Sequence, residues 1–221
     1  MIIAIDGPAG SGKGTITKLV AEKCNLIYID TGATYRCVAL SIIENNIDIK
    51  DEEKIIELTK SLNIEFTLDG KTILNGKDVS DRIREKDVTD IVSPVSSIIE
   101  VRKILVDLQR NMAKNKNVIM EGRDITTVVF PNANYKFYLD ASVEERANRR
   151  YIQNQEKGID MSLEEIIESI KKRDYNDMNK PYGALKRTSD QIYIDSTNMS
   201  IDEVVNKIIS IIGSEQNEFK R

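Results

Sequence analysis

The residues best suited to chemistry lie near the amino terminus, between Gly7 and Thr15. Gly7 is followed by four residues and then by Gly12 and Lys13, which is the spacing of a phosphate-binding loop. Glycines let backbone N–H groups converge on an anion where side chains would collide. Lys13 adds a positive charge that can reach a phosphate group during its transfer. The stretch therefore predicts a site for the phosphates of a nucleotide.

A phosphate-binding loop needs a strand before it and a helix after it. Residues 2–5 form an apolar run that predicts a buried strand, and apolar residues recur at helical spacing after Lys13. The start of that helix adds the positive end of its dipole. The alternative is a strand, turn and helix whose glycines serve only a tight turn. The predicted donor-binding residues are Gly7, Pro8, Ala9, Gly10, Ser11, Gly12, Lys13, Gly14 and Thr15.

One position departs from the general motif. Gly14 follows Lys13 where a Ser or Thr is usual, and the hydroxyl comes one place later, at Thr15. We predict Thr15 as the contact to Mg²⁺. Glu121, at the end of a later apolar run, is the alternative, because an acid in that place can hold Mg²⁺ through water.

The composition limits the possible chemistry. The 221-residue chain has no histidine, which excludes a Ser-His-Asp triad and a Cys-His pair. Transfer of a phosphoryl group from one phosphate to another is possible without histidine, because the attacking phosphate oxygen is already anionic and needs no base to deprotonate it. Catalysis then depends on positioning and on neutralisation of charge by Arg, Lys and Mg²⁺.

Composition also bears on partners and location. The net charge of −4 argues against a broad nucleic-acid-binding face, so we expect no nucleic-acid partner. No apolar run reaches membrane-spanning length and the chain starts directly in a predicted strand, so we expect no signal peptide and no membrane partner. We expect a monomer in the cytoplasm.

Strand and helix patterns alternate along the rest of the chain. Apolar runs predict strands at 26–29, 118–121, 136–140 and 191–195. Between residues 63 and 82, Asp69-Gly70 and Asn75-Gly76 predict hairpins in a small antiparallel patch. Helices are predicted over 83–97, with a break at Pro94, and over 98–113. The predicted fold is α/β, a three-layer α/β/α P-loop NTPase core with a mostly parallel sheet.

Charged residues follow several of these strands, where open α/β sheets place their ligands. Asp30 and Thr31 follow one strand, although a helix cap is the alternative for them. Arg123 and Asp124 follow the strand that ends at Glu121. Arg102 falls between apolar helical positions, and the pattern alone favours a solvated arginine.

A cluster of arginines follows Ser142 and Glu145, which predict a capping box at the start of a helix. Arg146, Arg149 and Arg150 have the i, i+3, i+4 spacing of one helix face. A solvated face is the ordinary explanation. Because the preceding motifs indicate a nucleotide site, we expect instead that these cations close over a bound triphosphate.

Together these segments resemble the bacterial cytidylate kinases, enzymes that phosphorylate CMP and dCMP. The resemblance runs almost end to end. The segment Gly-Lys-Gly-Thr, residues 12–15, is similar to that of the nucleoside monophosphate kinases. Its other marks are residues 5–8, 30–36, 122–124, 127–131, 137–142, 173–177 and 195–198.

The resemblance implies ATP-dependent phosphorylation of CMP and dCMP to CDP and dCDP, with ATP as donor, Mg²⁺ as cofactor and ADP as product. It implies the catalytic residues Lys13, Arg123, Arg146, Arg149 and Arg150. Arg36 and Arg123 would hold the CMP phosphate. Ser93, Arg102 and Asp124 would read the cytosine edge. The full set of implied substrate-binding residues is Asp30, Thr31, Arg36, Ser93, Arg102, Arg123, Asp124, Arg173, Asp177 and Lys180.

The resemblance also implies an internal division of one P-loop kinase domain. The core comprises about residues 1–36, 114–150 and 174–213. A small inserted subdomain that binds the acceptor nucleotide covers about 37–113, and a helical lid covers about 151–173. Several positions depart from the family. Lys180 stands where an arginine on the acceptor phosphate is usual, Thr126 replaces a glycine, and Thr34, Ala184 and Glu121 also differ from the usual residues.

Two other functions are alternatives to this one. A related kinase for another small acceptor predicts that Ser93, Arg102 and Asp124 do not converge. A nucleotide-dependent switch needs an Asn-Lys-x-Asp segment that reads guanine, and residues 179–182, Asn-Lys-Pro-Tyr, lack the Asp.

Overall fold

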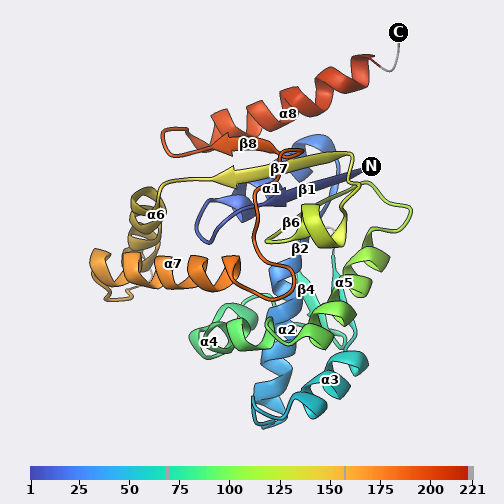
Figure 1. The fold of residues 1–221 in the computed structure, drawn as a ribbon, viewed down its shortest axis with the longest axis vertical. Coiled ribbons are helices and arrows are strands. Elements are labelled where there is room, and N and C mark those ends of the chain that lie inside the picture. The colour runs from blue at the N-terminus through green and yellow to red at the C-terminus, as the bar shows by residue number, and fades with distance from the viewer. Residues whose placement is uncertain (68–69, 157, 219–221) are drawn as a thin grey trace. The chain divides into compact units, whose positions relative to one another are not determined.

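The computed structural model describes residues 1–67, 70–156 and 158–218, which form two compact units (Figure 1). Unit 1 combines Met1–Leu26 with Val118–Arg221, and unit 2 is Ile27–Asn117. At the boundary of unit 2, the N–H of Ile27 donates to the carbonyl oxygen of Asn117 at 3.0 Å, which ties the two ends of that unit together.

Unit 1 is built on parallel strands that run side by side in the order β6-β1-β7-β8. Their bounds are Val118–Gly122 for β6, Ile2–Asp6 for β1, Tyr135–Asp140 for β7 and Ile192–Asp195 for β8. Ile3 of β1 pairs with Ile119 on one side and with Tyr135 on the other. Ile3, Ala4 and Ile5 are fully buried, as expected for a central strand covered on both faces.

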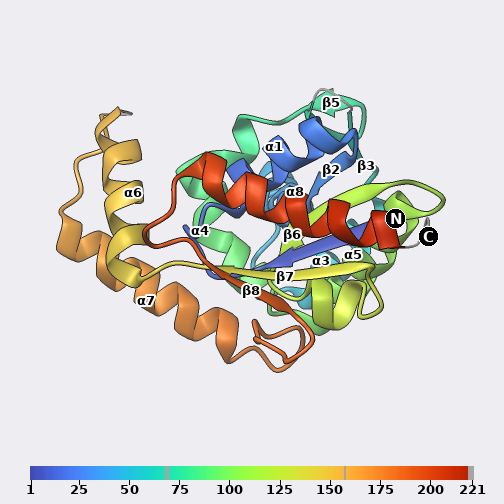
Figure 2. The same cartoon turned by 90° about the horizontal axis from the view of Figure 1, so that it is seen from above.

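Helices cover this sheet. The helices of unit 1 are α1 (Lys13–Cys24), α6 (Val143–Glu156), α7 (Leu163–Met178) and α8 (Ile201–Glu218), with a π-helical turn, η2 (Ile125–Val129). Helices α1 and α8 pack against each other, and Figure 2 shows them on one side of the strands with η2 on the other. The predicted α/β core with a mostly parallel sheet is confirmed.

Helices α6 and α7 pack against each other through Ala147, Ile166 and Ile170. Ser162 and Glu165, which have the Ser-x-x-Glu spacing of a capping box, cap the start of α7 reciprocally. At the start of α6, only one of the two hydrogen bonds of the predicted capping box is formed. Ser142 accepts from the N–H of Glu145, but the Glu145 carboxylate accepts from Arg149 instead of turning back to Ser142.

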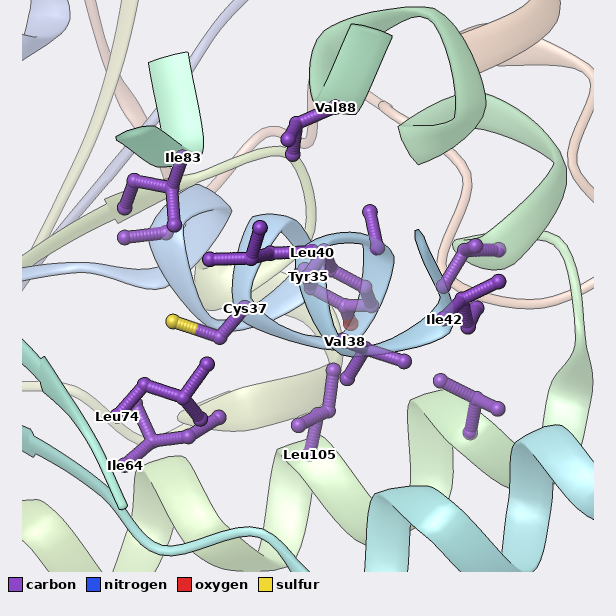
Figure 3. Close-up of a cluster of buried hydrophobic side chains, with 14 of the residues drawn as sticks. Tyr35, Cys37, Val38, Leu40, Ile42, Ile64, Leu74, Ile83, Val88 and Leu105 are labelled. Atoms are coloured by element: carbon purple, nitrogen blue, oxygen red, sulfur yellow. The ribbon is translucent and has the colours of Figure 1, made fainter. Parts of the chain in front are cut away.

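Unit 2 surrounds one buried helix, α2, which follows strand β2. Figure 3 shows Cys37, Val38 and Leu40 of α2 among apolar side chains from the other elements of this unit. A helix that is apolar on nearly every side is typical of such a central position. The elements are β2 (Ile27–Asp30), α2 (Thr31–Glu44), α3 (Glu52–Ser61), η1 (Arg82–Arg84), α4 (Lys86–Val95) and α5 (Ile99–Ala113).

A small antiparallel sheet completes unit 2, in the order β3-β4-β5. Its strands are Ile64–Phe66, Thr72–Leu74 and Lys77–Asp78. Asn75 and Gly76 have φ angles of 49° and 82°, as a primed hairpin turn requires, so this predicted hairpin is confirmed. Asp69, in the other hairpin signal, lies outside the described residues.

The helix predicted over 83–97 is shorter than expected. The 3₁₀ turn η1 occupies its first residues, and α4 begins at Lys86. Pro94 lies in the last turn of α4, which ends at Val95, so the predicted break is confirmed. None of the helices in the described ranges combines the length and the apolar character that crossing a membrane requires.

Candidate active site

The loop between β1 and α1 contains glycines that no other residue could replace without strain. Gly10 and Gly12 have φ angles of 79° and 87°, in the left-handed region. A Cβ atom on Gly7 would lie 2.0 Å from the carbonyl oxygen of Leu139, at the end of β7. Gly12 is the N-cap of α1 and offers no capping side chain, so the first N–H groups of α1 are left for an anion.

Lys13 is buried at the start of α1. Its Nζ donates to the carbonyl oxygen of Pro8 at 2.7 Å and to Oγ of Ser11 at 3.3 Å. Burial, and then the nearby Arg123 guanidinium, lower the pKa of Lys13 to about 7, although Glu121 counteracts them. Arg123 thus adds positive charge close to Lys13, and a phosphate bound in the loop would favour the protonated, charged form of the lysine.

Two arginines of α6 border the loop. Arg146 is 4% exposed, and its Nη1 donates to the carbonyl oxygen of Ala9, inside the loop, at 2.9 Å. Its Nη2 lies 2.7 Å from the Asp174 carboxylate on α7. Arg149 lies within 3.6 Å of where a Cβ on Gly12 would be.

The three predicted arginines differ in their surroundings. Arg149 donates from Nη2 to the carbonyl oxygen of Ser196 at 2.8 Å and from Nε to Glu145 at 2.7 Å. Arg146 is held on several sides by backbone and carboxylate, whereas Arg150 is exposed to solvent. A shared helix face, as predicted from their spacing, therefore does not give the three residues equal environments.

A second group of charges joins β6 to α7. Asp177 on α7 lies 2.8 Å from Nε of Arg123 and 3.0 Å from Nζ of Lys180. Burial opposes the ionisation of Asp177, but Arg123 and then Lys180 outweigh it and lower its pKa to about 2. Three residues that the resemblance assigns to the acceptor nucleotide thus form one ion-paired cluster.

Asp124 lies between Arg123 and η2 and is 4% exposed. The backbone N–H of the next residue, Ile125, donates to Asp6 at 2.8 Å, and the N–H of Thr126 donates to Asp6 at 2.9 Å. Burial raises the pKa of Asp6 to about 6. Sequence reasoning did not identify Asp6 or Thr126 as supports of this segment.

In unit 2, Asp30 both caps helix α2 and pairs with Arg36, so its two predicted roles are compatible. It accepts from the N–H of Ala33 at 3.1 Å, so it does cap α2, and it lies 2.6 Å from Nη2 of Arg36. It also lies 3.2 Å from Nη2 of Arg84. Burial opposes ionisation of Asp30, but Arg36 and Arg84 outweigh it and lower its pKa. No motif in the sequence pointed to Arg84, which is 54 residues from Asp30.

Arg102 is not the solvated arginine that its helical pattern alone favours. It is 3% exposed, and its guanidinium lies 5.3 Å from the centre of the Tyr35 ring. Its Nη1 donates to the carbonyl oxygen of Ser96 at 3.1 Å, and Oγ of Ser96 donates to the carbonyl oxygen of Ser93 at 3.0 Å. Ser93 and Arg102, two of the three residues assigned to cytosine, are therefore joined within unit 2.

The predicted residues thus fall into two sets, each belonging to one unit. The set of unit 2 comprises Asp30, Thr31, Arg36, Ser93 and Arg102. The set of unit 1 comprises the loop residues with Arg123, Asp124, Arg146, Arg149, Arg150, Arg173, Asp177 and Lys180. In unit 1, a glycine loop, a buried lysine and arginines meet at the carboxyl ends of parallel strands, which defines a phosphate-loop kinase.

Comparison with solved structures agrees with that class at the level of the fold. The shikimate kinase of Bacteroides thetaiotaomicron superposes with a TM-score of 0.50 at 11% identity, covering 96% of this chain and 98% of that one. A gluconokinase of Sinorhizobium meliloti 1021 superposes with a TM-score of 0.50 at 13% identity, covering 99% and 96%.

Sequence comparison is more specific. The family model for cytidylate kinase matches residues 3–214, and the chain belongs to the cytidylate kinase family. The chain is 50% identical over 208 residues to the cytidylate kinase of Fusobacterium nucleatum subsp. nucleatum, covering 94% of this chain and 95% of that one. It is 48% identical over 212 residues to the cytidylate kinase of Caldicellulosiruptor bescii, covering 95% and 94%.

Proposed function

We propose that this chain transfers the γ-phosphoryl group of ATP to CMP and dCMP, giving CDP or dCDP and ADP. Membership of the cytidylate kinase family supports the acceptor. The observation that carries the chemistry is the buried Lys13 at the phosphate-binding loop, bordered by Arg146 and Arg149. Those cations suit a donor with several phosphates.

The reaction needs charge neutralisation more than it needs a base. A phosphate oxygen of CMP bonds to the γ-phosphorus, and the bond from that phosphorus to the β-phosphate oxygen breaks, so ADP leaves with the electron pair. The attacking oxygen is already anionic, which suits a chain without histidine. Lys13 and the arginines stabilise the charge that spreads over the γ-oxygens in the transition state.

We assign the donor phosphates to the loop of residues 7–15 and catalytic roles to Lys13, Arg123, Arg146, Arg149 and Arg150. The acceptor phosphate is assigned to Arg36, Arg123 and Lys180, and the sugar to Arg173 and Asp177. The cytosine edge is assigned to Ser93, Arg102 and Asp124, with Asp30 and Thr31 lining the same site. The charge cluster around Asp177 and the burial of Arg102 support these roles.

The chain also has residues that suit Mg²⁺. No group of three or more His, Cys, Asp or Glu side chains in the described ranges is placed to hold a metal. Mg²⁺ usually takes one or two protein oxygens and completes its shell with substrate phosphates and water, so a full protein cage is not required. Thr15, exposed in the first turn of α1, would supply such an oxygen directly; the alternative is Glu121, at the end of β6, acting through water. Bound there, Mg²⁺ would neutralise donor phosphate charge.

The proposal includes the internal division stated above: a core of about 1–36, 114–150 and 174–213, an acceptor-binding insertion of about 37–113 and a lid of about 151–173. It also includes action as a monomer in the cytoplasm, without a nucleic-acid partner. The net charge of −4 supports that last part.

Replacement of the loop lysine tests the proposal. Lys13→Met keeps the length of an unbranched side chain but removes the charge, and should lower kcat for CMP-dependent ADP release by at least about a hundredfold. Lys18→Met, at an exposed position of the same helix, is the matched control and should keep near-normal activity. Equal activity of the two variants would contradict the proposed role of the loop.

A further inference from the structure

A buried hydroxyl connects three segments of unit 1. Thr126, in η2, is 2% exposed, and its Oγ1 donates to Oδ2 of Asp6 at 2.6 Å. The backbone N–H of Thr126 donates to the same carboxylate oxygen at 2.9 Å. Oγ1 also accepts a hydrogen bond from Nε2 of Gln191. The hydroxyl therefore uses its donor and accepts a bond at the same time.

Both partners of Thr126 are themselves fixed. Asp6 is fully buried at the end of β1, directly before the phosphate-binding loop, and its other oxygen accepts from the N–H of Ile125 at 2.8 Å. Gln191 lies just before β8, and its Oε1 accepts from the N–H of Thr188 at 2.7 Å. This bond orients the amide so that Nε2 points to Thr126.

The position of Thr126 in the chain gives the network a consequence for the site. Arg123 and Asp124 precede it by three and two residues and have proposed roles toward the acceptor phosphate and the cytosine edge. The bonds from Asp6 hold the start of η2 to the strand that carries the phosphate-binding loop. A shift of η2 would therefore move Arg123 and Asp124 relative to Lys13.

We propose that Thr126 is a positioning residue for the acceptor nucleotide: its hydroxyl, bonded to Asp6 and Gln191, sets Arg123 and Asp124 in their binding geometry. This inference rests on the proposed function.

Matched variants distinguish positioning from stability. Thr126→Val keeps the volume and removes the hydroxyl, whereas Thr126→Ser keeps the hydroxyl. Thr59→Val is the control, because Thr59 is a similarly buried threonine in α3 whose Oγ1 donates only to the carbonyl oxygen of Ile55. KM for CMP, KM for ATP, kcat and the midpoint of thermal unfolding are measured for each.

Thr126→Val should raise KM for CMP about tenfold and change KM for ATP by less than about twofold, because the bond lost is to a buried charged group. Thr126→Ser should restore KM for CMP to within about twofold of the parent chain. Thr59→Val should lower the unfolding midpoint and leave both KM values unchanged. If Thr126→Val does not fold, Thr126→Ala removes the same hydroxyl without a branched side chain and carries the same expectation.

Three results would overturn the inference: an unchanged KM for CMP in Thr126→Val, an equal rise for ATP and CMP, or no recovery with serine. If the parent chain itself did not turn over CMP, the proposed function would be refuted instead. The two failures are therefore distinguishable.

Discussion

The Nζ atom of Lys180 lies 3.0 Å from Oδ1 of Asp177, and the Lys180 side chain is only 8% exposed. The resemblance implies an arginine at this position, whereas Lys180 offers a point charge that is already engaged with a carboxylate. Because a guanidinium can hold a carboxylate and a phosphate with separate N–H groups, Lys180→Arg should lower KM for CMP about threefold.

Steady-state kinetics with varied CMP would check this expectation. Lys207→Arg, at an exposed position on α8, is the control for the added guanidinium. An unchanged or higher KM for CMP in Lys180→Arg would count against a contact between Lys180 and the acceptor.

The arginines of α6 should differ in their contribution to stability. Arg146→Met leaves the buried Asp174 carboxylate without its ion pair and removes a donor from the loop carbonyl of Ala9. It should lower the free energy of unfolding by about 3 kcal/mol. Arg150→Met, at an exposed position, should change it by less than about 0.5 kcal/mol. Urea denaturation measures both, and similar losses would refute the distinction.

Asp177 should make stability depend on pH in an acid window. Its pKa falls from 3.8 to about 2 on folding, mainly because Arg123 and Lys180 outweigh the effect of burial. A lowered pKa means that the folded protein holds the proton less tightly than the unfolded chain. The contribution of Asp177 is therefore present above about pH 4 and is lost as pH falls towards 2.

The comparison with Asp177→Asn isolates this effect. The parent chain should be more stable than the variant by about 2 kcal/mol near neutral pH, and the difference should shrink between pH 4 and pH 2. Glu57→Gln, on the exposed side of α3, should show no such trend. A difference that stays constant through this window would mean that the Asp177 pKa is not lowered by its partners.

The phosphate-binding loop offers a steric prediction. Gly7→Ala would place a Cβ 2.0 Å from the backbone oxygen of Leu139, so the loop or β7 must move. We expect a loss of about 2 kcal/mol of stability together with the loss of ATP binding. In Gly76→Ala, the added Cβ would meet no atom within 4 Å. The only cost is the strain of an alanine at a φ of 82°, about 1 kcal/mol of stability, and ATP binding should be retained. Thermal unfolding and calorimetric titration with ATP measure both, and normal ATP binding by Gly7→Ala would contradict the tight packing.

Local signals in the sequence were sufficient for much of this fold. The loop from Gly7 to Lys13, the Asn75-Gly76 turn and the capping box at Ser162 each depend on a few adjacent residues. Their backbone conformations are restricted by residue type, so neighbours along the chain reveal them.

Contacts between distant segments could not be predicted in this way. Arg84 reaches Asp30 across 54 residues, and Asp6 holds Thr126 across 120 residues. The burial of Arg102 also depends on how α5 packs within unit 2, which helical spacing alone does not determine. At α6, competition from Arg149 for the Glu145 carboxylate replaced half of the predicted capping box.

The most direct test of the proposed reaction is a coupled ADP-release assay of the purified chain with ATP, Mg²⁺ and one acceptor at a time: CMP, dCMP, UMP, AMP or shikimate. We predict that CMP and dCMP give kcat/KM values at least about tenfold above those of UMP, AMP and shikimate. Equal or higher values with UMP or AMP would contradict the assignment of this site to cytosine nucleotides.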